Sequence, residues 1–318
     1  MRFFKFLFCF FCFCCLMPSR FVLGSELPHR ITCIIPSRSE TVFWKEIDES
    51  IHTAAEEFQF ELTMIYTENS DPSIAMDLND AIETAILTDT EAIITSYTKA
   101  DSNTDELLKQ ARAAGIYVIF LDCDGPEELR DLYVGIDNEA AGYALGMYVK
   151  EHLQEGEKAL LYYSLSNQNS QNLLERTSGI KRAFASSPDS IETFEFSNYN
   201  DMTRIMELED YLLQNDSVTA LIATTEHTTV TAAQLFSRLS LPSRIQLYGF
   251  DQSDETMELL ETGQLQALVC QQHYEMGYQS VVLTNALLEG KVPDSDFYKI
   301  DFLILFENES KVDSFPIT

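Results

Sequence analysis

Two kinds of segment alternate along this 318-residue chain. Short runs that are apolar throughout indicate buried strands, and longer segments with apolar residues at helical spacing indicate amphipathic helices. The expected strands are 31–35, 61–66, 92–95, 117–121, 158–163, 191–196, 218–223, 245–250 and 265–269. The expected helices are 43–58, 73–87, 105–114, 138–153, 173–184 and 202–214, and the second of them begins behind Asp71-Pro72.

This alternation predicts an α/β fold. Strands that are apolar throughout and are joined by amphipathic helices are typical of a parallel sheet covered on both faces. The rhythm restarts near residue 138, and the chain is long enough for two domains of ordinary size. We therefore expect two similar lobes, each with its own doubly wound sheet.

The first 24 residues follow a different pattern. A basic start, Met1 to Lys5, precedes an apolar run over 6–17, which Pro18 ends. Such a helix spans roughly 18 Å, too short for a hydrocarbon core of ~30 Å. We predict that residues 1–24 are an export signal, cleaved after Gly24 or Ser25, and place the protein in the periplasm or at the outer face of the cytoplasmic membrane. The alternatives are a buried N-terminal helix or a retained anchor, and no lipobox is evident.

Composition narrows the chemistry. A net charge of −30 argues against nucleic acid, whose phosphates need a basic surface. Outside the export signal only Cys33, Cys123 and Cys270 remain, an odd number without a CxxC motif, so buried thiols are expected in place of disulfides or zinc. The histidines show no metal spacing and the glycines form no phosphate loop. We expect no metal and no cofactor.

Polar and aromatic residues gather just after the predicted strands. In open α/β sheets, ligands bind outside the carboxyl ends of the strands. Rings that stack on the C–H faces of a sugar, with charged and amide groups for its hydroxyls, suit a polyhydroxylated ligand. The segments and residues concerned are 37–43, Ser96, Asp122, 167–176, Asn198-Tyr199, Thr225-Glu226, Asp251 and Gln271.

Five stretches carry a family resemblance: Tyr133–Gly142, Arg176–Ile180, Tyr248–Asp251, Gly263–Leu265 and Gln271–Tyr278. Taken together, the chain from about 30 to 306 resembles the type 1 periplasmic sugar-binding proteins of the ribose- and galactose-binding group. Effector domains of lac-repressor-like regulators share that fold.

The resemblance implies two doubly wound parallel-sheet lobes joined by a three-crossing hinge. The crossings are expected near 135–136, 271–272 and 301–302. The N-terminal lobe would hold 30–135 plus 272–301, and the C-terminal lobe 136–271 plus 302–318. Closure of the hinge around a ligand is the motion that such a fold supports.

The resemblance also assigns ligand-binding residues. They are Thr41, Phe43, Trp44, Ser96, Asp122, Arg176, Tyr199, Thr225, Asp251 and Gln271. The aromatic members would stack on the sugar and the others would bind its hydroxyls. Departures from the pattern affect selectivity, because ribose-binding members carry an arginine at the position of Cys123 and amides at those of Thr41, Ser96 and Thr225. We expect a hexose or modified sugar to bind at least about tenfold more tightly than ribose.

Other roles are open for several of these residues. Trp44 is also a candidate core residue, and Arg176 a candidate partner for a surface acid. Asp251 could cap the helix that follows, and Asp122 a turn with Asp124. Asp137 is assigned to the hinge or to a helix cap and is left out of the site.

The function that fits these observations is an exported, monomeric solute-binding protein that captures a sugar without reacting with it and feeds an ABC sugar permease. The alternative is a sensor input that reports sugar to a membrane histidine kinase or chemoreceptor. A sugar-acting enzyme is the weakest reading, because no catalytic motif is present. A transcription regulator is disfavoured, because an export signal stands where a helix-turn-helix is expected.

Overall fold

The computed structural model describes residues 27–36, 41–67, 76–97, 102–164, 171–196, 202–239, 241 and 244–307. The expected export signal and Tyr199 lie outside these ranges. The chain first forms β1 (Arg30–Ile35), α1 (Val42–Glu57), β2 (Glu61–Tyr66), α2 (Leu78–Leu87), β3 (Ala92–Thr95), α3 (Ser102–Ala113), β4 (Tyr117–Leu121), η1 (Glu127–Leu129) and β5 (Leu132–Ile136).

The second half repeats the pattern. Its elements are α4 (Asn138–His152), β6 (Lys158–Ser164), α5 (Gln171–Ala183), η2 (Pro188–Ser190), β7 (Ile191–Phe196), α6 (Met202–Gln214), β8 (Val218–Ala223), α7 (Glu226–Leu239), β9 (Gln246–Phe250), α8 (Asp254–Glu261) and β10 (Ala267–Gln271). The chain then adds α9 (His273–Leu288), β11 (Phe297–Ile300) and β12 (Phe302–Phe306).

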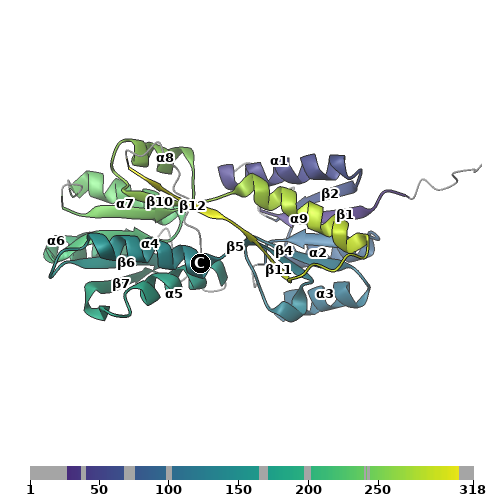
Figure 1. Ribbon diagram of the computed structural model, residues 1–318, viewed down its shortest axis with the longest axis horizontal. Helices are drawn as coiled ribbons and strands as arrows, with labels where there is room; N and C mark the ends of the chain where they lie inside the picture. Colours follow the sequence, from purple (N-terminus) through teal and green to yellow (C-terminus); the bar gives the residue numbers. More distant parts are fainter. Residues whose placement is uncertain are drawn as a thin grey trace, which may run out of the picture.

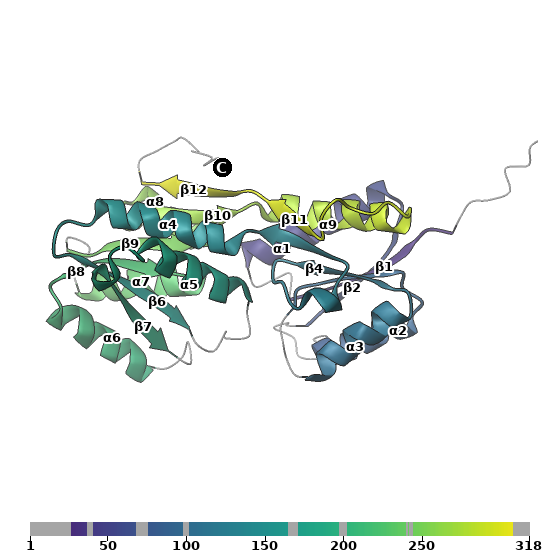
Figure 2. The same ribbon diagram turned by 60° about the horizontal axis from the view of Figure 1, so that its bottom comes forward.

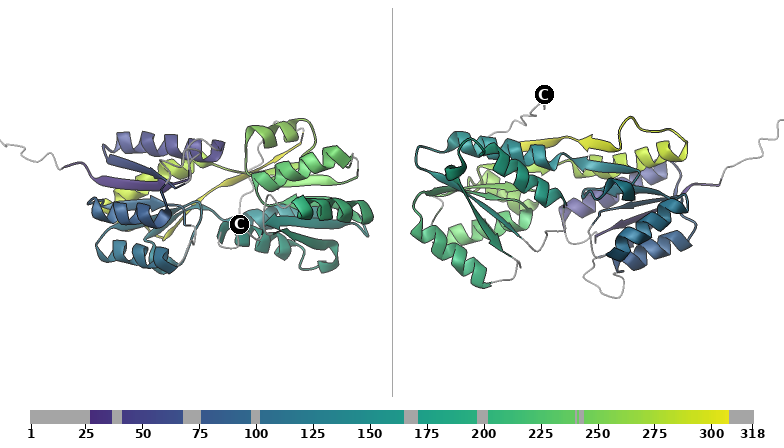
Figure 3. Two further views of the ribbon diagram at one scale, coloured as in Figure 1. Left: turned by 180° about the vertical axis from the view of Figure 1, so that it is seen from behind. Right: turned by 90° about the horizontal axis from the view of Figure 1, so that it is seen from below.

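These elements build two lobes, each around a six-stranded sheet (Figure 1). The first sheet has the order β11-β5-β4-β3-β1-β2 and is parallel throughout. The second has the order β12-β10-β9-β8-β6-β7, with β12 antiparallel at its edge. Helices lie on both faces of each sheet, with α1 and α9 opposite α2 and α3 in the first lobe (Figures 1 and 3). The predicted pair of doubly wound lobes is confirmed.

The chain passes between the lobes three times, after β5, after β10 and between β11 and β12. Figure 2 shows these segments together along one side of the molecule. Side chains tie them to one another. Gln272 donates from Nε2 to the carbonyl oxygen of Asp301 at 3.0 Å. Asp137 caps α4 by accepting from the Ala140 amide at 2.8 Å and also pairs with Lys299 at 3.2 Å, so it serves both of the roles considered for it.

Several element predictions were wrong. The helix expected from Ser73 begins at Leu78, because the Asp77 side chain caps it by accepting from the Asn79 amide. The last strand of the second half runs 267–271, two residues later than expected. β5, β11, β12, α7 and α9 were not predicted as elements. β11 has only four residues and two of them are exposed, so its hydrophobic pattern is weak.

The three cysteines outside the expected export signal are buried thiols. Burial raises the pKa of Cys270 to about 12 and also raises the pKa of Cys33. These thiols therefore pack like small apolar side chains, as expected. Across the described ranges, no helix has both the length and the apolar character that crossing a membrane requires.

Candidate functional site

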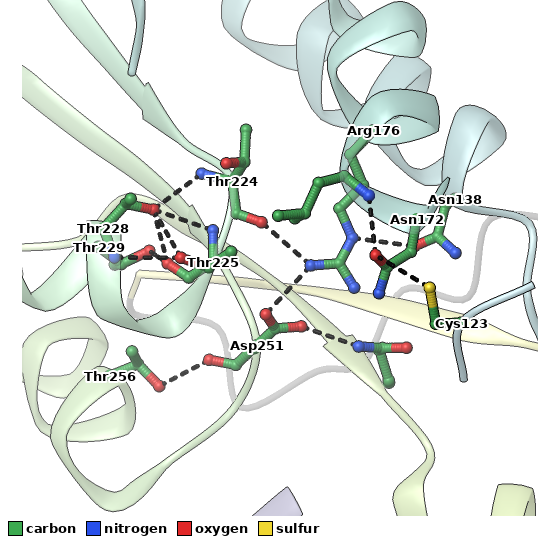
Figure 4. Close-up of polar contacts among 12 residues, drawn as sticks. Cys123, Asn138, Asn172, Arg176, Thr224, Thr225, Thr228, Thr229, Asp251 and Thr256 are labelled. Carbon is green, nitrogen blue, oxygen red and sulfur yellow. Dashed lines mark hydrogen bonds and ion pairs between the residues drawn. The ribbon is translucent and has the colours of Figure 1, made fainter. Parts of the chain in front are cut away.

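Arg176 is the centre of a buried polar network in the second lobe. Its side chain is 2% exposed although it lies on α5, a helix at the protein surface. Nε donates to Oδ1 of Asn138 at 2.9 Å, and Nη1 donates to the carbonyl oxygen of Thr224 at 3.0 Å (Figure 4). Nη1 also forms an ion pair with Asp251 at 3.1 Å. The guanidinium lies over the ring of Phe250, 4.8 Å from its centroid.

Glycines bring α5 close enough for this network to form. A Cβ atom at Gly142 would lie 2.1 Å from the carbonyl oxygen of Arg176. A Cβ atom at Gly179 would lie 2.0 Å from the carbonyl oxygen of Glu139. Helices α4 and α5 therefore meet backbone to backbone, which no larger residue allows. This contact holds Arg176 beside Asn138, the first residue of α4.

Asp251 has both carboxylate oxygens occupied. Oδ2 pairs with Arg176, and Oδ1 accepts from Nε2 of Gln271 at 2.8 Å. The helix that follows is capped by Ser253, whose side chain accepts from the amide of Thr256 in a capping box. The alternative interpretation of Asp251 as the cap of that helix is therefore wrong.

Asp122 is the counterpart of Asp251 in the other lobe. Each follows a strand at the same position in its sheet, β4 or β9, with φ of 67° or 69°. The amide of Asp122 donates to the Val134 carbonyl, as that of Asp251 donates to Val269, at 3.0 and 2.9 Å. Such left-handed conformations are uncommon outside glycine and tend to cluster at functional sites. Two equivalent aspartates thus end equivalent strands on facing lobes.

Asp122 differs from Asp251 in what its carboxylate contacts. Its residue is 8% exposed, and its carboxylate accepts no hydrogen bond within the described ranges; Tyr133 donates instead to the Asp122 backbone carbonyl at 2.7 Å. Burial raises the pKa of Asp122 to about 7; the Arg176 charge lowers it and the Asp251 charge raises it. Asp122 therefore lies within electrostatic reach of the network in the second lobe. The nearby turn is capped by Asp124, not by Asp122.

The aromatic pair at the start of α1 packs against the hinge. Phe43 and Trp44 meet edge to face at 4.8 Å, and Phe43 lies 4.5 Å from the ring of His273, which opens α9 directly after the second crossing. Both aromatic side chains are partly buried against the core. His273 is 3% exposed and bonds Glu46 through Nδ1 at 3.2 Å. Burial lowers its pKa, against the opposing charges of Asp251 and Glu46.

The smaller polar candidates have local roles. Thr41 caps α1 by accepting from the Trp44 amide at 3.3 Å, and Thr225 caps α7 by accepting from the Thr228 amide at 3.2 Å. Ser96 follows β3 and is 7% exposed. Cys123 places its sulfur 3.9 Å from Oδ1 of Asn172, a contact between the two lobes (Figure 4).

The structure thus brings Asp251 into direct contact with both Arg176 and Gln271 and sets Asp122 opposite them. Sequence reasoning missed Asn138, Thr224 and His273. Asn138 and His273 lie inside motifs that were recognised, but their side chains were not assigned to the site. Thr224 contributes its backbone carbonyl, for which a sequence carries no signal. No group of three or more metal-ligating side chains occurs in the described part of the chain.

Comparisons with known proteins agree on one architecture. The family model described as periplasmic binding protein domain matches residues 31–292. The ribose import binding protein of Escherichia coli (strain K12) is 18% identical over 258 residues, 81% of this chain and 84% of that protein. GanP, a glucose-galactose binding protein from Geobacillus stearothermophilus, superposes with a TM-score of 0.76 at 20% identity, covering 90% of this chain and 99% of that one. The XylFII-LytSN complex contains a chain that superposes with a TM-score of 0.71 at 22% identity, covering 88% and 98%.

Proposed function

The chain belongs to the periplasmic binding protein domain family, and from that premise we propose that it captures a sugar or similar polyhydroxylated ligand by closing its two lobes. The observation that carries the proposal is the placement of Asp122 opposite the pair Arg176–Asp251, each at the carboxyl edge of its own sheet. A ligand between these edges gains contacts from both lobes only when they close. Binding then shifts the population toward the closed form.

In this proposal the lobes are 30–135 with 272–301, and 136–271 with 302–318. The proposed ligand-binding residues are those expected from the sequence. Phe43, Trp44 and Tyr199 stack on the sugar; Asp122, Arg176, Asp251 and Gln271 bind hydroxyl groups; Thr41, Ser96 and Thr225 line the site. The capping role of Thr41 leaves its hydroxyl oxygen with a second lone pair for a ligand, whereas the Thr225 hydroxyl also bonds with that of Thr228 at 3.0 Å.

Binding without chemistry is part of the proposal. A glycosidase needs two carboxyl groups that are free to act on the scissile bond. Both oxygens of Asp251 are held by Arg176 and Gln271, so Asp251 is poorly placed to act as a nucleophile or a base. Asp122 alone does not supply the pair.

The closed form is proposed to deliver its ligand to an ABC sugar permease, from a monomeric protein outside the cytoplasmic membrane. The second candidate is a sensor input for a membrane kinase or chemoreceptor. This candidate is supported by the fold that the chain shares with a chain of the XylFII-LytSN complex. The identity of the neighbouring genes, permease or kinase, separates the two.

A thermal-shift screen over neutral and amino sugars tests the proposal. A ligand that binds the folded state raises stability by RT ln(1 + [L]/Kd). The ligand found is then titrated into Asp251→Ala by calorimetry, where losing a charge-assisted hydrogen bond should weaken binding roughly ten- to a hundredfold. Competition among ribose, galactose, glucose and xylose measures the expected preference against ribose. A complete screen without a stabilising sugar would overturn the proposal.

A further inference from the structure

Among the described residues the carboxylate of Asp122 has no partner, and the hydroxyl group of a neutral sugar would give it a hydrogen bond without balancing its charge. As a whole residue Asp122 is more than nine-tenths buried, at the end of β4, and within the described ranges no donor reaches its carboxylate. The adjacent side chain, Cys123, is a buried thiol that carries no positive charge. A buried carboxylate without a counter-ion is costly, and proteins ordinarily pair it.

The positive charge that acts on Asp122 is that of Arg176, and Arg176 already forms an ion pair with Asp251. Arg176 serves Asn138, Thr224 and Asp251 with its Nε and Nη1 donors. Counting the ionised form of Asp122 as −1, Asp251 as −1 and Arg176 as +1 leaves this group with one negative charge. The proton that His273 would need is disfavoured, because burial lowers the pKa of its ring. Among the described residues, the group therefore lacks one positive charge.

The other described cations around the hinge do not supply that charge. Arg130 pairs with Asp124 and Asp296, and Lys299 pairs with Asp137. Glu175 on α5 adds a further negative charge, and the neighbouring acids raise its pKa in addition to the larger effect of burial. A metal ion does not fit well either, since Asp251 has both oxygens occupied and one free carboxylate makes a poor metal site.

We propose, building on the sugar-capture function above, that the ligand carries a protonated amine which pairs with Asp122 when the lobes close. The chemical class is an amino sugar or an amine-bearing polyol. An ammonium group donates hydrogen bonds and also neutralises the group formed by Asp122, Asp251 and Arg176. A hydroxyl group in the same place donates one hydrogen bond and leaves the negative charge buried.

Calorimetric titration of the purified protein at about pH 7 and low salt tests this with three matched pairs of ligands. They are D-galactosamine with D-galactose, D-glucosamine with D-glucose, and 1-deoxynojirimycin with 1,5-anhydroglucitol. In at least one pair the amine should bind roughly ten- to a hundredfold more tightly. Asp122→Asn keeps the size of the side chain and tolerates its left-handed backbone, and it should reduce that preference to below about threefold. Glu175→Gln removes a nearby charge without touching Asp122 and should preserve most of it.

The outcomes separate the two proposals. If a neutral sugar binds and no amine exceeds its neutral partner, the ammonium inference is overturned and sugar capture stands. A preference that survives Asp122→Asn overturns the assignment to Asp122. If none of the six compounds nor any other sugar binds, sugar capture fails and this inference fails with it. If Asp122→Asn does not fold, the wild-type protein provides the test. It should bind the amine more tightly than the neutral partner in a matched pair, and it should lose that preference at a pH above the pKa of the amine.

Discussion

Replacing Arg176 with methionine should destabilise the ligand-free protein strongly. Methionine keeps an unbranched apolar stem and removes the guanidinium. The hydrogen bonds to Asn138 and Thr224 and the ion pair with Asp251 are lost together. Because Arg176 is 2% exposed, water does not readily replace these partners.

The expected cost is about 3–5 kcal/mol of unfolding free energy, as for other buried pairs that lose one partner. Adding three charge-assisted hydrogen bonds at about 1.5–3 kcal/mol each gives a larger figure. That sum overstates the effect, because the three contacts share one group and relax together. Retention of the Gln271 hydrogen bond to Asp251 also limits the loss.

Urea unfolding followed by far-ultraviolet circular dichroism measures this cost. Arg182→Met is the matched control, since Arg182 lies on the same helix, pairs with Glu139 at 3.0 Å and is 52% exposed. It should change stability by less than about 1 kcal/mol. A double-mutant cycle with Asp251→Asn should show a coupling of about 1–3 kcal/mol. If Arg176→Met unfolds at the same urea concentration as Arg182→Met, the buried network does not stabilise the lobe and the reasoning is wrong.

Four further outcomes are expected. Gly179→Ala should cost about 1–3 kcal/mol in urea unfolding, because its Cβ would meet the Glu139 carbonyl; wild-type stability would contradict the close α4–α5 packing. The pKa of Asp122, about 7 when folded and 3.8 ordinarily, means that burial of this acid costs stability as pH rises from about 4 to 7. The stability of Asp122→Asn relative to wild type should therefore increase across that window, and a constant difference would exclude the shift. Small-angle scattering should show a smaller radius of gyration with saturating ligand than without it, and an unchanged radius would contradict closure of the lobes. N-terminal sequencing of the native exported protein should begin at Ser25 or Glu26, and an intact Met1 on a cytoplasmic protein would refute export.

The sequence predicted the site less completely than the fold. Asp122, Asp251 and Gln271 could be chosen because each follows a strand, and the carboxyl edges of parallel strands gather ligands. The sequence did not reveal what these side chains contact. Arg176 was a candidate for the ligand or for a surface acid, whereas the structure commits three of its hydrogen bonds to the protein itself. The role of Thr224 rests on its backbone, which sequence patterns do not report.

The spacing of apolar residues along the chain determined the alternation of strands and helices, because each element must place its apolar side chains in a core. It therefore determined the two lobes and their doubly wound sheets. The tertiary structure decided the rest. It placed the short edge strands β11 and β12, brought the backbones of α4 and α5 into contact, and paired Arg176 with Asp251 and not with Asp122. The two aspartates follow equivalent strands, yet among the described residues only Asp251 is paired. That difference depends on which lobe holds Arg176 and how closely the lobes approach, and it arises from contacts between residues far apart in the chain.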